Sequence, residues 1–503
     1  MKTSEIIVFI VYLLCMLGIG IFFFVKNRNG GEKTYFLGGR EMGPWVAALS
    51  AGASDMSAWV LMGLPTSIYA LGLGQVWIPV GLAIGYTISW LLEAPRLRKF
   101  SIVANDSITI PQYLTNRFLS KSLALQVICA IVFLVAYTIY AASSVKACGT
   151  LFHTVIGMDP QIAMYLAAVV IVGYTFLGGF SAVCWTDFFQ GILMFAALMT
   201  VPIVIAITKD MDPAALSVVY SYKDAVSGEM VECSFGTGLF DASWQDIISG
   251  LAWGLGYFGM PHILVRFMSI EKPSMVKKSA TVAIIWVICA LGCACLIAYF
   301  GRMFLAEELL TAGAQKMVFI DFARKLFPSF IAGILMAAII AASMSTADSQ
   351  LLVASSSFTS DIYKPIIRKD ADEKEILWVG RIIVVIVAVI AFFIASSKGS
   401  GAQAIMNLVE NAWAGFGSSF GPVILLSLFW RRFTYKGAIG GVLGGIIVDI
   451  LWFNFLSGST GIYELFPGFI AGLICAVVVT LLDKKPAKEV TDLFDRAVSE
   501  EDE

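Results

Sequence analysis

Asp55 lies in the stretch SAGASDMSAW, where small and hydroxyl-bearing residues interrupt a segment that is otherwise apolar enough to cross a membrane. A charged side chain at the centre of a bilayer costs about 2.5 to 3.5 kcal/mol on insertion scales. Chance placement is a poor explanation for that cost. We therefore predict that Asp55 stays ionised and stabilises a bound cation, either as a direct ligand or through its charge.

A second polar group lies in AASMSTADSQLL, in another apolar segment. The spacing i, i+3, i+4 and i+7 places four residues on one helix face, namely Ala342, Ser345, Thr346 and Ser349. Hard cations such as sodium prefer oxygen ligands, and carbonyls with hydroxyls supply them without a buried negative charge. A single membrane serine more often bonds back to its own helix. Three hydroxyls on one face favour an ion site.

Two apolar segments contain glycine and proline at densities that weaken a helix. The first continues from Asp55 to Gly63 and Pro65, and the second reads LAWGLGYFGMPH and includes Pro261. In transporters built from inverted repeats, discontinuous helices at corresponding positions of the two halves carry the binding site. The alternative is that the glycines only allow close helix packing. Two interrupted spans, five spans apart, favour the transporter interpretation.

Other kinds of chemistry find little support in the sequence. His153 and His262 are the only histidines and lack the spacing of a zinc site. We find no nucleophile elbow and no P-loop. The letters GLGYFG match a dinucleotide-binding motif, but they belong to a membrane segment and no strand precedes them. We therefore predict that the chain is not an enzyme and that an ion gradient supplies its energy.

The composition indicates that transmembrane helices position these residues. Of 503 residues, 58% are hydrophobic and 14% are charged, far from the proportions of soluble domains. Apolar stretches long enough to span a bilayer recur along the chain, and we predict about thirteen spans. The positive-inside rule places the N-terminus outside and the C-terminus in the cytoplasm, with the acidic tail as a solvated extension. Basic residues at span ends give no sign of a nucleic-acid partner.

Several motifs together resemble the sodium/solute symporter family: SAGASDMSAW, YTIYAAS, AVCWTD, WGLGYFGMPHILVRFM, MSTADSQLL and AWAGFGSSFGP. The likeness runs in order over most of the chain. It implies an all-α integral membrane protein with the five-plus-five inverted repeat of the leucine-transporter type. The expected parts are the N-terminus, first span and loop at 1–43, a transport core at 44–430, two further spans at 431–482 and the acidic tail at 483–503.

The resemblance also assigns site residues. It implies a sodium site formed by the carbonyls of Ala53, Met56 and Ala342 and the hydroxyls of Ser345 and Thr346, with Asp55 beside them. It implies a substrate site formed by Tyr140, Trp253, Tyr257 and Pro261. Aromatic faces suit the apolar ring of an imino acid, although membrane aromatics more often lie in interfacial belts.

A third set, Asp187, Asp348 and Ser349, has two interpretations. Some relatives hold a second sodium at matching positions, and an extra carboxylate at residue 348 would strengthen such a site. Two carboxylates without a cation would instead repel each other or recruit a basic partner such as an inner-loop Arg or Lys. We favour this second case, an inner gate with one sodium transported per substrate.

The resemblance implies a function in a bacterial cytoplasmic membrane. We expect sodium-coupled uptake of L-proline by alternating access, with sodium as the coupling ion and no cofactor. One alternative is a sodium symporter for another small solute, such as pantothenate or a different amino acid. A transporter-like solute sensor is a further alternative, which the short tail disfavours.

Overall fold

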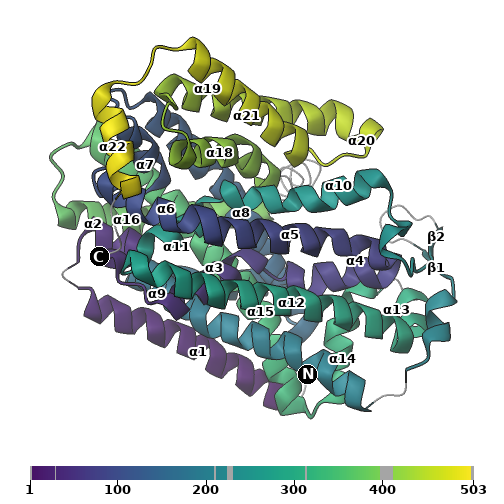
Figure 1. Cartoon of the computed structure of the whole chain (residues 1–503). Coiled ribbons are helices and arrows are strands. Elements are labelled where there is room, and N and C mark those ends of the chain that lie inside the picture. The colour runs from purple at the N-terminus through teal and green to yellow at the C-terminus, as the bar shows by residue number, and fades with distance from the viewer. Residues whose placement is uncertain are drawn as a thin grey trace.

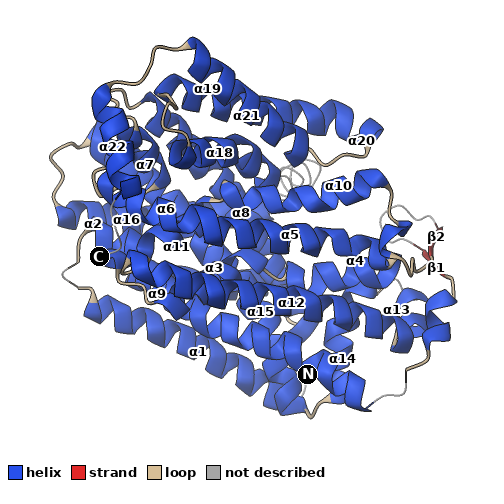
Figure 2. Ribbon diagram, in the orientation of Figure 1, coloured by secondary structure: helices blue, strands red, loops and turns tan. Residues whose placement is uncertain are grey.

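The computed structural model describes residues 3–28, 30–208, 211–223, 230–311, 314–396 and 412–499. Apart from one two-stranded hairpin, its regular elements are helices (Figure 2). The longer helices are α1 (Thr3–Lys26), α5 (Trp77–Ile88), α8 (Ala124–Ile156), α9 (Pro160–Thr208), α12 (Val276–Phe304), α15 (Ser329–Phe358), α16 (Glu373–Ser396), α18 (Ala412–Phe429), α19 (Tyr435–Leu451), α21 (Leu465–Leu482) and α22 (Lys488–Ser499). The shorter elements are α2 (Glu32–Leu37), α3 (Pro44–Met56), α4 (Leu64–Leu71), α6 (Ala94–Val103), α7 (Ile110–Arg117), α10 (Trp244–Ala252), α11 (Pro261–Ser269), α13 (Ala306–Thr311), α14 (Val318–Leu326), α20 (Ser457–Thr460), β1 (Tyr220–Lys223) and β2 (Met230–Cys233).

The all-α membrane class is confirmed, while the number of spans is not. Within the described residues, ten helices are long and apolar enough to cross a membrane, or eleven if one bent pair counts as a span. The difference from thirteen arises where helices join or break. Helix α9 runs for 49 residues across a kink at Gly179, whose φ of 58° favours glycine. Helices α3 and α4 are each too short to span alone.

Both predicted interruptions are present. Helix α3 ends at Met56 because Ser57 adopts φ 46° and ψ −169°, and a π-helical turn, Trp59–Gly63, follows before α4. The second interruption is a 3-10 stretch, Trp253–Phe258, between α10 and α11, where the chain bends by 46°. Each break leaves backbone N–H and C=O groups without partners in their own helix. Inside a membrane protein such groups need a ligand or a polar wall as a partner.

Helix α15 forms the centre of the bundle and packs against α1, α3, α8 and α9 (Figure 1). Every residue from Leu335 to Ser355 is buried, so the helix has no lipid-facing side along this length. Its alanines and serines allow the close approach of neighbouring helices that membrane interfaces favour. The polar residues of α15 therefore face other helices rather than lipid.

The C-terminal segment departs from the sequence prediction. Residues 488–499 form α22, which packs on α6 and α7 and is not the solvated extension we expected. Phe494 contacts Phe100 with a ring separation of 5.4 Å, and Arg431 pairs with Asp495 at 2.7 Å. Cys148 in α8 is a buried, free cysteine.

Candidate functional site

Four of the six residues of the predicted sodium site meet where α3 ends against the middle of α15. The hydroxyl of Ser345 lies 2.9 Å from the carbonyl oxygen of Ala53 and 3.1 Å from that of Ala342. Thr346 donates to the same Ala342 carbonyl at 3.2 Å. All four residues are buried. The structure thus brings together oxygen atoms from two helices. Ser345 and Ala53, which are in contact, are 292 residues apart along the chain.

The end of α3 supplies further oxygen atoms. The last four carbonyls of a helix lack partners within that helix, and they carry its partial negative charge. In α3 these carbonyls belong to residues 53–56, and Met56 is the final helical residue. Because Ser57 turns the backbone away with a positive φ, the helix cannot continue and cover them. This terminus is electrostatically suited to a cation.

Asp55 lies beside these carbonyls, but its carboxylate is directed across the bundle. Tyr257 in the second broken segment donates a hydrogen bond to Oδ2 of Asp55 at 2.5 Å. The two residues also line one cavity, so the contact links the two interrupted spans at a solvent-accessible wall. Through its position Asp55 can influence both the helix terminus and the contents of that cavity.

We call this space the aromatic cavity, and it encloses about 570 Å³. Its lining residues are Asp55, Met56, Ser57, Trp59, Leu82, Tyr140, Ser143, Trp253, Tyr257, Trp413 and Tyr463. Three of the four predicted substrate residues are among them. Pro261 is not, because it occupies the first turn of α11, where its missing N–H is tolerated and it begins the helix after the break.

Trp253 is the centre of the aromatic wall. Its ring is stacked on Tyr463 at 4.9 Å and on Trp59 at 6.3 Å. Trp413 stacks on it at 6.5 Å and donates its indole N–H to the Trp253 carbonyl at 3.0 Å. Trp59, Trp413 and Tyr463 were not predicted as site residues. Trp59 and Trp413 lie within the motifs SAGASDMSAW and AWAGFGSSFGP, but aromatics are common in membrane proteins, so the sequence does not show that these three line one cavity.

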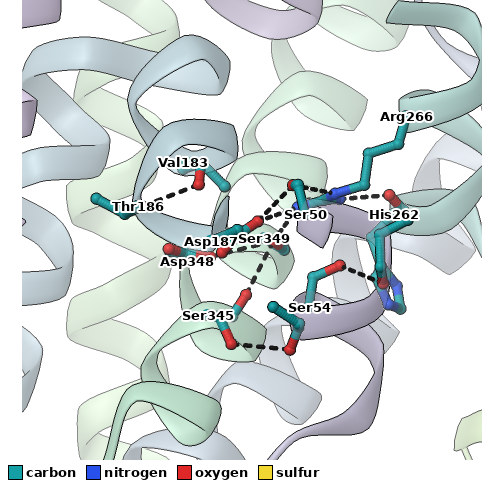
Figure 3. Close-up of polar contacts among 12 residues, drawn as sticks. Ser50, Ser54, Val183, Thr186, Asp187, His262, Arg266, Ser345, Asp348 and Ser349 are labelled. Atoms are coloured by element: carbon teal, nitrogen blue, oxygen red, sulfur yellow. Dashed lines mark hydrogen bonds and ion pairs between the residues drawn. The ribbon is translucent and has the colours of Figure 1, made fainter. Parts of the chain in front are cut away.

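A buried ion pair lies on the other side of the predicted sodium site (Figure 3). Nη2 of Arg266 is 2.7 Å from Oδ2 of Asp187 and 2.7 Å from the Ser349 hydroxyl. Ser50 bonds to both charged side chains, at 2.7 Å from each. Arg266 also donates to the His262 carbonyl at 2.5 Å. One guanidinium therefore joins α3, α9, α11 and α15.

Asp348 lies in the same cluster but has different partners. The Tyr174 hydroxyl donates to one carboxylate oxygen at 2.7 Å, and the Ser349 hydroxyl is 3.1 Å from the other. The cluster thus contains two buried carboxylates and one guanidinium. A basic partner was predicted from an inner loop, but Arg266 lies within α11. Arg266 is part of the motif HILVRFM, but only the structure shows which carboxylate it pairs with.

A second ionic contact ties together the loops on the face where α22 docks. Arg40 donates to the Met268 carbonyl at 2.5 Å and to Asp106 at 3.0 Å, and Lys33 also pairs with Asp106. Although partial burial acts in the opposite direction, the hydrogen bonds and charges of Lys33 and Arg40 hold the pKa of Asp106 below its usual value. These contacts fasten the segment before α3 to the end of α11.

A further cavity, which we call the vestibule, has a volume of about 600 Å³. Its lining residues are Ala58, Trp59, Met62, Gly63, Thr66, Ser67, Ser143, Lys146, Ala147, Thr150, Leu151, Gln315 and Lys316. Trp59 and Ser143 line both spaces. The two cavities are therefore neighbours that share a wall.

Known structures show the class of fold. A "Na+-coupled sialic acid symporter" in a "substrate-bound outward-open state" matches with a TM-score of 0.73 at 19% identity, covering 97% of this chain and 99% of that one. A transporter of the nucleobase-cation-symport-1 family matches with a TM-score of 0.50 at 12% identity, covering 92% of this chain and 98% of that one. The fold is that of an all-helical membrane transporter with inverted repeats.

Sequence comparisons narrow this class to a family. The model of the sodium:solute symporter family matches residues 35–445. The sodium/proline symporter of Escherichia coli (strain K12) is 41% identical, over 99% of this chain and 96% of that protein. The high-affinity proline transporter of Bacillus subtilis (strain 168) is 42% identical, over 95% of this chain and 98% of that protein. The chain belongs to the sodium:solute symporter family, and it is a transporter rather than an enzyme.

Proposed function

We propose that this protein couples the inward movement of sodium to the uptake of L-proline by alternating access. The relatives named above support sodium as the coupling ion and proline as the substrate. The observation that carries the proposal is the contact of Ser345 with the Ala53 carbonyl, because it brings hydroxyl oxygen to a helix terminus beside a substrate-sized cavity. We infer a bacterial cytoplasmic membrane, with the N-terminus outside and the C-terminus inside.

The proposed sodium ligands are the carbonyls of Ala53, Met56 and Ala342 and the hydroxyls of Ser345 and Thr346. Several of these oxygens already lie within hydrogen-bond distance of one another. A sodium ion bound between these oxygens would be held by their lone pairs, while the hydroxyl protons stay on Ser345 and Thr346 and turn away from the ion. Asp55 would strengthen the site through its charge from the adjacent residue.

Proline would occupy the aromatic cavity. Its apolar ring would lie against Trp253 and Tyr140, which are large aromatic surfaces within the membrane. Asp55 is the only charged residue among the described residues that line this cavity, and its carboxylate would attract the secondary ammonium. Since the same carboxylate acts on sodium, the two sites would be coupled, and linkage requires the effect of each ligand on the other to be equal.

Arg266, Asp187, Ser50 and Ser349 would form the inner gate. In the observed arrangement the ion pair fastens α11 to α9, and release of the substrate toward the cytoplasm requires such contacts to separate. Arg266 already neutralises one carboxylate, which supports one transported sodium per proline. The driving force is adequate, since about 2.3 kcal/mol per 100 mV and about 1.4 kcal/mol per tenfold gradient sustain a several-hundredfold accumulation.

The test is uptake of labelled proline into proteoliposomes with and without an inward sodium gradient. We expect uptake that depends on sodium and is inhibited by unlabelled proline more strongly than by pantothenate or other amino acids. Ser345→Ala should weaken sodium dependence, while Ser343→Ala, on the same buried helix but outside the proposed ligand set, serves as the control. Sodium-independent uptake, or stronger inhibition by another solute, would contradict the proposal.

A further inference from the structure

Lys146 is a charged residue of the long helix α8, and the proposed mechanism does not use it. It lies ten residues before α8 ends at Ile156, with the buried residues Val145 and Cys148 nearby. At about 1.5 Å per residue this 33-residue helix is about 50 Å long, more than the roughly 30 Å of a bilayer's hydrocarbon core, so part of α8 extends beyond that core. A lysine of a membrane helix generally faces a partner or a water-filled path.

No acidic partner explains this lysine. Among the residues that the structure describes, Lys146 takes part in no ion pair. It lines the vestibule instead, as does Lys316, and these are the only charged side chains among the described residues of that cavity. Both charges are positive, whereas the aromatic cavity contains the carboxylate of Asp55. The two neighbouring spaces therefore have opposite charge.

The geometry of α8 connects the two spaces. Tyr140, Ser143 and Lys146 follow at intervals of three residues and so lie along one side of the helix. Tyr140 lines the aromatic cavity, Ser143 lines both cavities and Lys146 lines the vestibule. Lys146 is thus about 4.5 Å further along the helix axis than Ser143. It therefore lines the space that adjoins the aromatic cavity.

We propose that the vestibule is an outer subsite for the carboxylate of the entering amino acid, with Lys146 as its charged contact. The inference rests on the proposed function, because it requires a zwitterionic substrate. The carboxylate end pairs with Lys146 while the ammonium end faces Asp55 in the next cavity. Thr66 and Thr150 also line this space, and their hydroxyls donate to the carbonyls of Met62 and Lys146. The lysine repels sodium, so this subsite serves the substrate and not the ion.

The two lysines differ in what they contribute. Lys316 is exposed, so water and salt screen its charge. Lys146 is partly buried in the wall of the vestibule, where a charge acts more strongly on a nearby ligand. Lys316→Gln is therefore a matched control, which removes the same charge from the same cavity at a more exposed place.

The experiment measures association and dissociation rates of labelled L-proline with the full-length protein in nanodiscs at saturating sodium. Because the subsite is occupied during entry only, Lys146→Gln should slow both rates about fivefold and leave the dissociation constant unchanged. Lys146→Arg should restore the rates, and Lys316→Gln should remain within twofold of wild type. The second probe is labelled L-prolinamide, which lacks the carboxylate, and Lys146→Gln should not slow its association.

Each contrary result has a distinct meaning. Unchanged proline rates in Lys146→Gln, or equal slowing of prolinamide, would overturn the subsite while proline binding by wild type stands. A chloride dependence of wild-type binding that disappears in Lys146→Gln would assign the lysine to an inorganic anion and overturn the carboxylate assignment. Failure of wild type to bind proline at all would instead overturn the proposed function.

Discussion

The hydroxyl of Tyr257 donates a 2.5 Å hydrogen bond to Oδ2 of Asp55, and this contact joins the two interrupted spans at the wall of the aromatic cavity. Asp55 immediately precedes Met56, whose carbonyl is a proposed sodium ligand. One carboxylate therefore lies between the proposed ion site and the proposed substrate site. A change at either proposed site would reach the other through a single side chain and its hydrogen-bond partner.

The first prediction concerns the charge of Asp55. Asp55→Asn keeps the shape of the side chain but removes the negative charge beside the end of α3. We expect the sodium concentration for half-maximal proline uptake to rise at least tenfold, which corresponds to about 1.4 kcal/mol. Tyr257→Phe removes only the hydrogen bond and should produce a smaller shift. The measurement is uptake against sodium concentration, and an unchanged sodium dependence in Asp55→Asn would exclude an ionic role.

The second prediction concerns the hydroxyls of α15. Ser345→Ala and Thr346→Ala each remove one proposed sodium ligand, so sodium affinity should fall first and proline affinity only through coupling. Ser343→Ala should leave both affinities near the wild-type values. Calorimetric titration of sodium, with and without proline, separates the two effects because thermodynamic coupling must be equal in both directions. If proline binds equally well with and without sodium in wild type, the symport mechanism fails.

The third prediction concerns the aromatic wall. Trp253→Ala, Tyr140→Ala and Tyr257→Ala should each weaken proline binding by about 1 to 3 kcal/mol, as expected for the loss of most of a buried aromatic contact. Trp413→Phe keeps a ring but loses the hydrogen bond to the Trp253 carbonyl, so its effect should be smaller. Direct binding at saturating sodium is the assay. Wild-type dissociation constants in all three alanine variants would place the substrate elsewhere.

The fourth prediction concerns the ion pair of the inner gate. Arg266→Gln leaves Asp187 as a buried charge without its main partner, which typically costs about 3 to 5 kcal/mol. Arg266→Gln/Asp187→Asn removes both charges and should recover much of the thermal stability while transport stays impaired. Melting temperatures in detergent and proteoliposome uptake are the measurements. Additive destabilisation in the double variant would show that the two charges do not act as a pair.

The oxygen-rich face of α15 could be predicted from sequence because helical periodicity alone places Ser345, Thr346 and Ser349 together. The glycines and Pro261 likewise marked the interrupted spans, since they act on the local backbone. Contacts between distant elements were not accessible in this way. Neither the partner of Arg266 nor the place of Tyr463 in the cavity follows from periodicity, because both depend on how helices pack. The position of Lys146 in the wall of the vestibule depends on helix packing in the same way.

The last prediction concerns stoichiometry. Asp187 and Asp348 together carry more negative charge than Arg266 can neutralise, so a second sodium is the alternative to an inner gate. In the observed arrangement the guanidinium lies within 2.7 Å of both Asp187 and Ser349, two of the groups such an ion would need. We therefore expect one sodium per proline in wild type, and the same ratio in Asp348→Ser. The reversal potential of proline flux at several sodium gradients measures this ratio. A value of two in wild type that falls to one in Asp187→Asn would make these carboxylates ligands of a second transported ion.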